Sequence, residues 1–298
     1  MHKSLNLINQ KAINKLSKFS FADGVFSHLV KLPQDSIFGL LADFAKDTNP
    51  KKISLSAGTY KDDDNKPFIL NCVRKAQEIH LSKKLDMEYL AIEGLQSFIN
   101  NSLKIAYTDK NKSLQNGEVA GIQALSGTGA LYLGMKFLAD NYKVSNTIMI
   151  PDPTWPNHPG VAALAGLKTA KYRYYDNKTS KLDLNGLLED LEKAPNGTIV
   201  LLHSCAHNPT GMDPNQDQWK QIFNVLKKKQ HLPFFDNAYQ GFASGDLDKD
   251  AWVIRNYSAD GNRMLLAQSY AKNFGMYGQR VGCFSMICQS KEEADVVM

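Results

Sequence analysis

The chain has 298 residues, of which 43% are hydrophobic and 22% are charged, and its formal net charge is +5. This composition indicates an ordinary globular protein that is long enough to bury a large core. Lysine and arginine are scattered along the chain, so we expect no nucleic-acid partner. No apolar run approaches the roughly 18 residues of a membrane span, so we expect no membrane insertion.

The beginning of the chain is basic. Lys3, Lys11, Lys15 and Lys18 all precede the first acidic residue, Asp23. This composition is typical of a mitochondrial presequence, although such segments are usually rich in arginine; a basic tail without fixed structure is the alternative. We therefore expect residues 1–25 to form a basic N-terminal extension.

Helical and strand patterns follow this extension. Apolar residues between Ile37 and Phe44 recur at helical spacing, and Thr48–Pro50 ends this predicted helix. A short strand and turn is predicted over residues 53–60, which contain Gly58.

From about Gly121, helical patterns alternate with short β-rich runs. The predicted helices are residues 129–141, 184–193 and 216–229, and the predicted strands are residues 147–150, 198–203, 233–236 and 264–268. Such alternation favours an α/β fold with a mostly parallel central sheet flanked by helices.

Three successive predicted strands end in polar, reactive groups. Residues 198–203 run into Cys205–Gly211, residues 233–235 end at Asp236, and residues 264–268 end at Ser269. Because ligands bind outside the carboxyl ends of the strands in open α/β sheets, we expect one common site there.

Lys272 is the central residue of this predicted site. A lysine at the end of a buried strand can lose its proton by desolvation and form a Schiff base with an aldehyde. A hydroxyl, a guanidinium and the opening of a helix could hold a phosphate nearby; these groups belong to Ser269, Arg280, Ser126, Gly127 and Thr128. A lysine beside a phosphate clamp is what pyridoxal 5′-phosphate (PLP) requires of a protein.

The other groups that this cofactor needs are also present. Asp236 could keep the pyridine nitrogen protonated, although a helix cap or a surface turn is the alternative role for this carboxylate. Asn208 and Tyr239 could hydrogen-bond the phenolic oxygen, and Trp155 could stack on the ring. Lys272 could then also act as the general base that moves a proton.

Two other interpretations of these motifs are less favoured. A Ser-x-x-Lys pattern such as Ser269 to Lys272 also occurs in penicillin-binding proteins, but the sequence after Lys272 lacks the Ser-Asp-Asn and Lys-Thr-Gly elements they carry. His203, Cys205 and His207 suggest zinc, but no fourth ligand is nearby, so we expect no metal site. The four cysteines have no CxxC or disulfide-framework spacing and are expected to be reduced, buried thiols of an intracellular protein.

From about Leu32 to its end, the chain resembles the aspartate aminotransferase family, which is class I and fold type I among PLP-dependent enzymes. The segments that carry this resemblance are residues 54–60, 88–95, 123–130, 152–158, 203–211 and 233–252. The resemblance implies a ping-pong transamination of L-aspartate and 2-oxoglutarate to oxaloacetate and L-glutamate through a Schiff base on Lys272, with Asp236 and Tyr239 as further catalytic residues.

The resemblance also implies roles that the residues alone do not. Gly58 would belong to a loop that closes over the substrate, which Trp155 and Asn208 would also contact. Tyr89 would reach the phosphate of the neighbouring subunit in a homodimer with shared active sites. His158 and His203 would support the aspartate.

The resemblance further implies a domain division. Residues 26–60 would form an N-terminal arm and small-domain segment, and residues 61–298 a large PLP-binding domain. The family's two substrate-carboxylate arginines lie beyond the position of Met298, so we expect a C-terminally truncated chain with an incomplete small domain. A silent fragment that binds PLP without efficient turnover, or an aminotransferase of broader, aromatic specificity, are the alternatives. The amino-acid sequences of residues 268–273 and 47–52 resemble the mitochondrial branch of the family more than the cytosolic one. We therefore expect the protein to be located in the mitochondrial matrix, with the cytoplasm as the alternative.

Overall fold

The computed structural model describes residues 24–31, 36–54 and 58–298. The chain divides into two compact units, Met1–Gly58 and Thr59–Met298. The first unit contains helix α2 (Ser36–Lys46), where a helix was predicted. The strand predicted over residues 53–60 is absent from the part of that segment that the structure describes, and residues 55–57 lie outside the described residues. At the end of that segment the Tyr60 backbone N–H donates to a side chain, the Tyr277 hydroxyl, and the Tyr60 carbonyl accepts the Phe68 N–H of the following turn.

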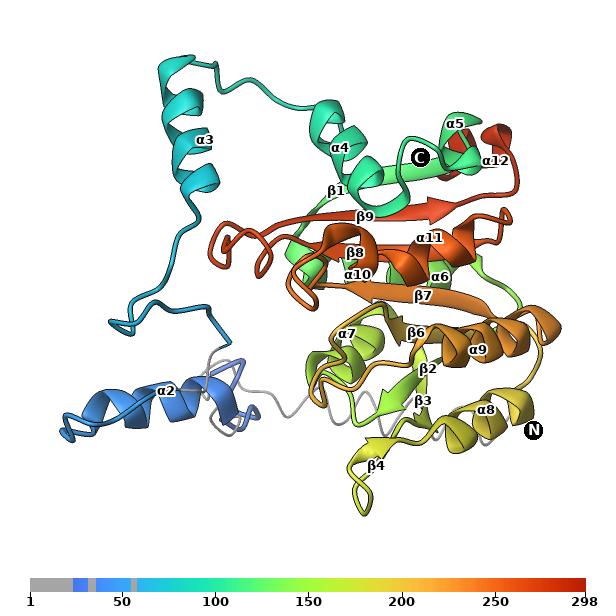
Figure 1. Ribbon diagram of the computed structural model, residues 1–298, viewed down its shortest axis with the longest axis horizontal. Coiled ribbons are helices and arrows are strands. Elements are labelled where there is room, and N and C mark those ends of the chain that lie inside the picture. Colours follow the sequence, from blue (N-terminus) through green and yellow to red (C-terminus); the bar gives the residue numbers. More distant parts are fainter. Residues whose placement is uncertain (1–23, 32–35, 55–57) are drawn as a thin grey trace. The chain divides into compact units, whose positions relative to one another are not determined.

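A mixed sheet forms the centre of the second unit (Figure 1). Within the described residues, seven strands join in the order β1-β9-β8-β7-β6-β2-β3. Strands from β3 to β8 run parallel to their neighbours, while β9 is antiparallel to both β8 and β1. The bounds are Val119–Leu125 (β1), Thr147–Asp152 (β2), Lys168–Arg173 (β3), Ile199–His203 (β6), Leu232–Asn237 (β7), Met264–Ser269 (β8) and Val281–Ile287 (β9). The predicted α/β fold with a mostly parallel central sheet is confirmed.

Helices cover both faces of this sheet, and its central strands β6, β7 and β8 are buried on both sides. Neighbouring residues of one strand enter different clusters, because successive side chains point to opposite faces: Phe234 packs with α6 (Ser126–Asn141) and α7 (Asn157–Ala165), whereas Phe235 packs on the other side. The helices on that other side are α4 (Gln96–Tyr107), α8 (Leu184–Lys193), α9 (Gln216–Lys228) and α11 (Trp252–Ser258). Burial on both faces explains why these strands are short, continuous apolar runs.

The remaining elements are short or peripheral. They are α3 (Asn71–Ser82), α5 (Lys112–Gln115), α10 (Leu247–Asp250), α12 (Lys291–Val297) and the small hairpin of β4 (Tyr175–Asp176) and β5 (Lys181–Leu182). Helix α3 has no buried residue. Cys72 is therefore exposed, contrary to the expectation of a buried thiol, whereas the other three cysteines are buried; all four are free. Among the described residues, the helices are too short or too polar to span a membrane.

Side-chain caps mark the starts of α8 and α9. Asn215 and Gln218 form a reciprocal capping box at α9, and the Asp183 side chain caps α8. Helix α6 begins at Ser126, three residues before the predicted start. Ser126 adopts a positive φ of 61°, so the chain turns from β1 directly into the helix without a loop.

Candidate active site

A pocket opens at the carboxyl ends of β6, β7 and β8. It brings together most of the residues that the sequence singled out, from six separate segments of the chain. The predicted residues that line it are Ser126, Gly127, Thr128, Trp155, Asn208, Asp236, Tyr239, Ser269, Lys272 and Arg280. The position follows from the fold, because parallel strands place their carboxyl ends at the same edge of the sheet.

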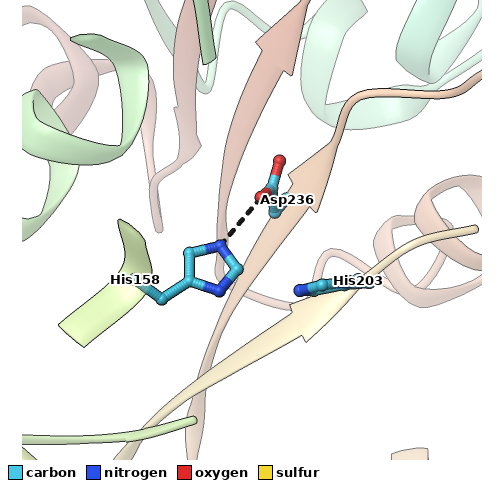
Figure 2. A group of neighbouring side chains, drawn as sticks. All are labelled: His158, His203 and Asp236. Atoms are coloured by element: carbon cyan, nitrogen blue, oxygen red, sulfur yellow. Dashed lines mark hydrogen bonds and ion pairs between the residues drawn. The ribbon is translucent and has the colours of Figure 1, made fainter. Parts of the chain in front are cut away.

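Asp236 is the penultimate residue of the central strand β7 and lies next to His203 of β6 and Ala267 of β8. Its Oδ2 accepts a hydrogen bond from Nε2 of the fully buried His158 at 3.0 Å (Figure 2). The other ring nitrogen of His158 pairs with the Thr154 hydroxyl at 2.7 Å, which orients the imidazole. Burial alone would raise the pKa of Asp236, but the His158 hydrogen bond and the nearby positive charges outweigh it and lower the pKa below its usual value. Asp236 is therefore held as a carboxylate.

His203 lies beside this pair, on the neighbouring strand (Figure 2). Its Nδ1 accepts the backbone N–H of Asn208 at 2.9 Å, so the proton of the neutral ring is on Nε2. Burial lowers the pKa of His203 to about 4, against the opposing charge of Asp236, and the ring is neutral at physiological pH. Among the described residues its buried Nε2 has no hydrogen-bond partner.

His158, His203 and Asp236 also offer three ligand atoms within 4.8 Å of one another. Both nitrogens of His158 are already engaged, one with Thr154 and one with Asp236. A metal ion would have to displace the proton between His158 and Asp236. The geometry is that of a buried imidazole hydrogen-bonded to a carboxylate.

Lys272 and Tyr239 face each other across the pocket. The Lys272 Nζ lies 5.3 Å from the centroid of the Tyr239 ring. Burial lowers the pKa of Lys272, the Asp236 charge opposes this effect, and the Arg280 charge adds to it. Burial and the Asp236 charge raise the pKa of Tyr239, against a side-chain hydrogen bond with Asn208. Lys272 is thus a lysine whose neutral form is more accessible than in water.

The start of α6 forms the anion-binding end of the pocket. No side chain caps this helix, so its first backbone N–H groups are available to a ligand. The hydroxyls of Ser126 and Ser269 lie 3.1 Å apart, and a Cβ on Gly127 would lie 3.0 Å from the Ser269 Cβ, so a larger residue would be crowded in this corner. Arg280 adds a guanidinium, whose Nη1 donates a hydrogen bond to the Tyr277 carbonyl at 3.1 Å. Amides, hydroxyls and a guanidinium together fit a phosphate group.

Trp155 forms another wall of the pocket. Its ring meets the His158 ring edge-on, with centroids 5.2 Å apart. The loop that carries it leads into α7, which also supplies His158. One short segment therefore provides both a flat apolar surface and the partner of Asp236.

Two predicted site residues are not among the residues of the second unit that line the pocket. Tyr89 does not line the pocket and is 95% exposed. Gly58 belongs to the first unit. Their predicted roles depend on a neighbouring subunit and on a substrate loop, respectively, and stay predictions.

The sequence alone missed several residues of the site. Cys205 lines the pocket, and burial raises the pKa of its thiol to about 12, so it acts as a small neutral wall residue. Its place between His203 and Asn208 was the available signal. Thr154 and Tyr277 were missed because their partners, His158 and Tyr60, are identified only by the fold.

Comparison with known proteins shows the family of this chain. Residues 50–296 match the family model described as aminotransferase class I and II. The mitochondrial aspartate aminotransferase of Gallus gallus is 46% identical over 273 residues, which cover 92% of this chain and 64% of that protein. The cytoplasmic aspartate aminotransferase of Oryza sativa subsp. japonica is 50% identical over 274 residues, which cover 92% and 67%. The chain thus spans about two thirds of the length of the curated relatives it matches.

Solved structures agree with this result. The aspartate aminotransferase from Saccharomyces cerevisiae cytoplasm superposes with a TM-score of 0.85 at 40% identity, covering 92% of this chain and 70% of that one. An aromatic-amino-acid aminotransferase from Burkholderia pseudomallei, covalently bound to pyridoxal phosphate, superposes with a TM-score of 0.88 at 38% identity. The match covers 92% of this chain and 68% of that one. The broad specificity aminotransferase from Leishmania mexicana superposes with a TM-score of 0.88 at 41% identity, covering 94% of this chain and 68% of that one. The chain therefore belongs to the class I and II aminotransferases.

Proposed function

We propose that this protein is a PLP-dependent aspartate aminotransferase that converts L-aspartate and 2-oxoglutarate to oxaloacetate and L-glutamate. The observation that carries the proposal is one pocket that joins a lysine of lowered pKa, a buried carboxylate and an uncapped helix start with hydroxyls and a guanidinium. The identity of 46–50% to aspartate aminotransferases supports this substrate pair.

The residues of the pocket fit PLP at both of its ends. Ser126, Gly127, Thr128, Ser269 and Arg280 would hold the phosphate. When bound, PLP supplies an electron-withdrawing ring that makes the Cα proton of an amino acid acidic.

The chain's own groups would then act on that proton and on the ring. Asp236, kept ionised by His158, would pair with the pyridine nitrogen and keep it protonated. Asn208 and Tyr239 would hydrogen-bond the phenolic oxygen, and Trp155 would cover one face of the ring. Lys272, in its neutral form, would take the proton from the substrate Cα and return it to the product.

The test is a PLP titration of the purified chain, followed by turnover of aspartate with 2-oxoglutarate. The wild type is expected to gain a visible absorption band and to turn over. Lys272→Ala is expected to lose the band, and its rate should fall by roughly 10²–10⁴-fold, which is the usual contribution of a general base. Lys249→Ala, which changes an exposed lysine on α10, is the matched control.

Three results would contradict the proposal in different ways. If PLP gives no band in the wild type, the cofactor assignment is wrong. A band without turnover would identify a chain that binds PLP but is catalytically silent. Faster turnover of phenylalanine than of aspartate would place the activity with the broad and aromatic aminotransferases among the solved relatives.

We also propose a homodimer with shared active sites, in which Tyr89 reaches the anion-binding end of the partner's pocket. The strong exposure of Met87, Tyr89 and Ile92 supports this arrangement.

For location we propose the mitochondrial matrix, on the basis of the acid-free residues 1–22, with the cytoplasm as the alternative. Curated relatives include both mitochondrial and cytoplasmic enzymes, and recovery of the protein in the cytosolic fraction of cells would contradict the matrix.

A further inference from the structure

Tyr277 lies between Lys272 and Arg280 in the sequence. It hydrogen-bonds to Arg280 and also to Tyr60, at the beginning of the second unit. Its carbonyl oxygen accepts a hydrogen bond from Arg280 Nη1 at 3.1 Å. Its hydroxyl oxygen accepts one from the backbone N–H of Tyr60 at 3.0 Å, across 217 positions of sequence. A single residue therefore links the anion-binding end of the pocket to the segment that follows Gly58.

This segment, residues 59–68, forms a closed turn. The Phe68 N–H donates to the Tyr60 carbonyl at 3.1 Å, and the Asp62 N–H donates to the Lys66 carbonyl at 2.9 Å. No residue from 59 to 68 is buried, so packing alone does not fix the 59–68 turn.

Tyr60 makes the contacts that attach the turn to the rim of the pocket. Its ring meets Phe68 at 5.5 Å and Phe242 at 6.2 Å, both edge-on. Phe242 belongs to the loop that begins at Tyr239, and Tyr277 is close enough to Tyr239 for its phenol to help raise the pKa of Tyr239, after burial and the Asp236 charge. Tyr277 thus joins the turn, which its hydroxyl binds, to Arg280, which its carbonyl binds, in the neighbourhood of Tyr239.

We propose that the Tyr277 hydroxyl is a positioning group that couples the order of the 59–68 turn to ligand occupancy of the pocket. A ligand that contacts Arg280 and Tyr239 restrains Tyr277, and Tyr277 in turn restrains the backbone of Tyr60. The identity of the ligand, PLP, rests on the proposed function; the hydrogen bond itself does not. Because the turn directly follows Gly58, its order bears on substrate binding more than on the chemical step.

Tyr277→Phe separates the two links, because it removes the hydroxyl and keeps the carbonyl that anchors Arg280. Hydrogen exchange of the full chain, with and without PLP, measures the order of residues 59–68. Without PLP, we expect the variant to exchange faster in this turn by roughly three- to tenfold, as for one lost hydrogen bond of ordinary strength. With PLP, the wild-type turn should become protected, and most of this protection should be lost in the variant.

A PLP titration of the same variant checks that the pocket is intact. Its affinity should change by less than about threefold, because no group that would contact the phosphate is removed. In the turnover assay, KM for aspartate should rise more than kcat falls. Tyr142→Phe is the matched control, since it also removes one phenolic hydrogen bond, to the Gly197 carbonyl at 2.8 Å, but at the amino ends of the strands.

Each result either supports or overturns the coupling. Equal exchange of residues 59–68 in Tyr277→Phe and in the wild type would overturn it, as would an equal effect of Tyr142→Phe. A PLP band without PLP-dependent protection in the wild type would overturn the coupling and leave the cofactor assignment standing. Absence of the band would overturn the cofactor assignment and the coupling with it, whereas faster exchange in the variant without PLP would still establish the hydrogen bond.

Discussion

The imidazoles of His158, His203 and His207 form a continuous row behind the Asp236 carboxylate. Centroids of neighbouring rings lie 5.1 and 4.5 Å apart, and the ring of Tyr174 stacks on the far side of His207 at 3.8 Å. Of these three imidazoles, only that of His158 hydrogen-bonds the Asp236 carboxylate. The other two rings are buried and neutral, so they fix the position of the aspartate's surroundings without adding positive charge to the site.

The buried imidazoles of His203 and His207 make stability depend on pH. Burial lowers the pKa of His203 to about 4 and that of His207 to about 3, whereas an unfolded histidine titrates near 6.5. Between those values the unfolded chain binds more protons than the folded chain, so the free energy of unfolding falls as pH is lowered from about 6.5 to 4. Each group contributes at most about 1.4 kcal/mol per pH unit.

His207→Phe is expected to flatten this dependence while keeping the ring stack on Tyr174. The variant also loses the hydrogen bond between His207 Nδ1 and Thr210, but that loss shifts stability without changing its slope between pH 5 and pH 7. Urea denaturation of the cofactor-free protein at several pH values measures the slope. Parallel lines for the variant and the wild type would show that His207 does not titrate differently on unfolding.

Side-chain chemistry predicted the pocket residues better than it predicted their supports. Lys272, Asp236 and Asn208 follow apolar runs, so the rule that ligands bind at strand ends was sufficient to group them. The Thr154–His158–Asp236 chain and the Tyr60–Tyr277 bond join residues 78 and 217 positions apart. Such pairs become neighbours only through tertiary packing, which no local pattern encodes.

At the scale of elements, the buried parallel strands were the predictable part. Strands β2, β6, β7 and β8 all lie where apolar runs were singled out, within two residues at each end. Strand β3 carries mostly exposed residues at the edge of the sheet, so it lacks an apolar run. The antiparallel β9 and its partner β1 are defined by pairing with each other, which their sequences do not reveal.

The contact of β9 with the start of α6 sets the shape of the anion-binding end. A Cβ on Gly282 would lie 2.6 Å from the backbone C and O of Ser126 and 2.7 Å from the Gln268 carbonyl. Because these are backbone atoms, Gly282→Ala must push β9 away from β8 and from the start of α6. We expect a loss of roughly 1–3 kcal/mol in the free energy of unfolding, as for other overpacked sites, and weaker PLP binding.

Gly278→Ala is the matched control for this prediction. Its Cβ would meet nothing within 4 Å, and its φ is outside the left-handed region. Urea denaturation and a PLP titration compare both variants with the wild type. Gly282→Ala with an unchanged denaturation midpoint would mean that β9 does not press on α6 in solution.

At the scale of the molecule, composition and alternation predicted the class of fold and nothing finer. The alternation of helices and strands from Gly121 was sufficient for an α/β sheet, whereas strand order depends on which edges pair, and that is a tertiary property. The chain divides into two units after Gly58, and the predicted domain bounds stay predictions. Neither composition nor charge gave information about assembly.

Assembly is the property that the exposed apolar residues before α4 bear on. Met87 and Ile92 are 94% and 95% exposed, and monomeric proteins rarely leave large contiguous apolar surface uncovered. We expect the chain to sediment as a dimer at micromolar concentration, and Ile92→Glu to shift it toward the monomer, because the dimer would have to bury an unpaired charge. If Tyr89 completes the partner's site, the same variant should also bind PLP more weakly. Val144→Glu, which changes an exposed apolar residue after α6, controls for the added charge. A wild-type chain that sediments as a monomer, or an Ile92→Glu variant that remains a dimer, would contradict the shared site.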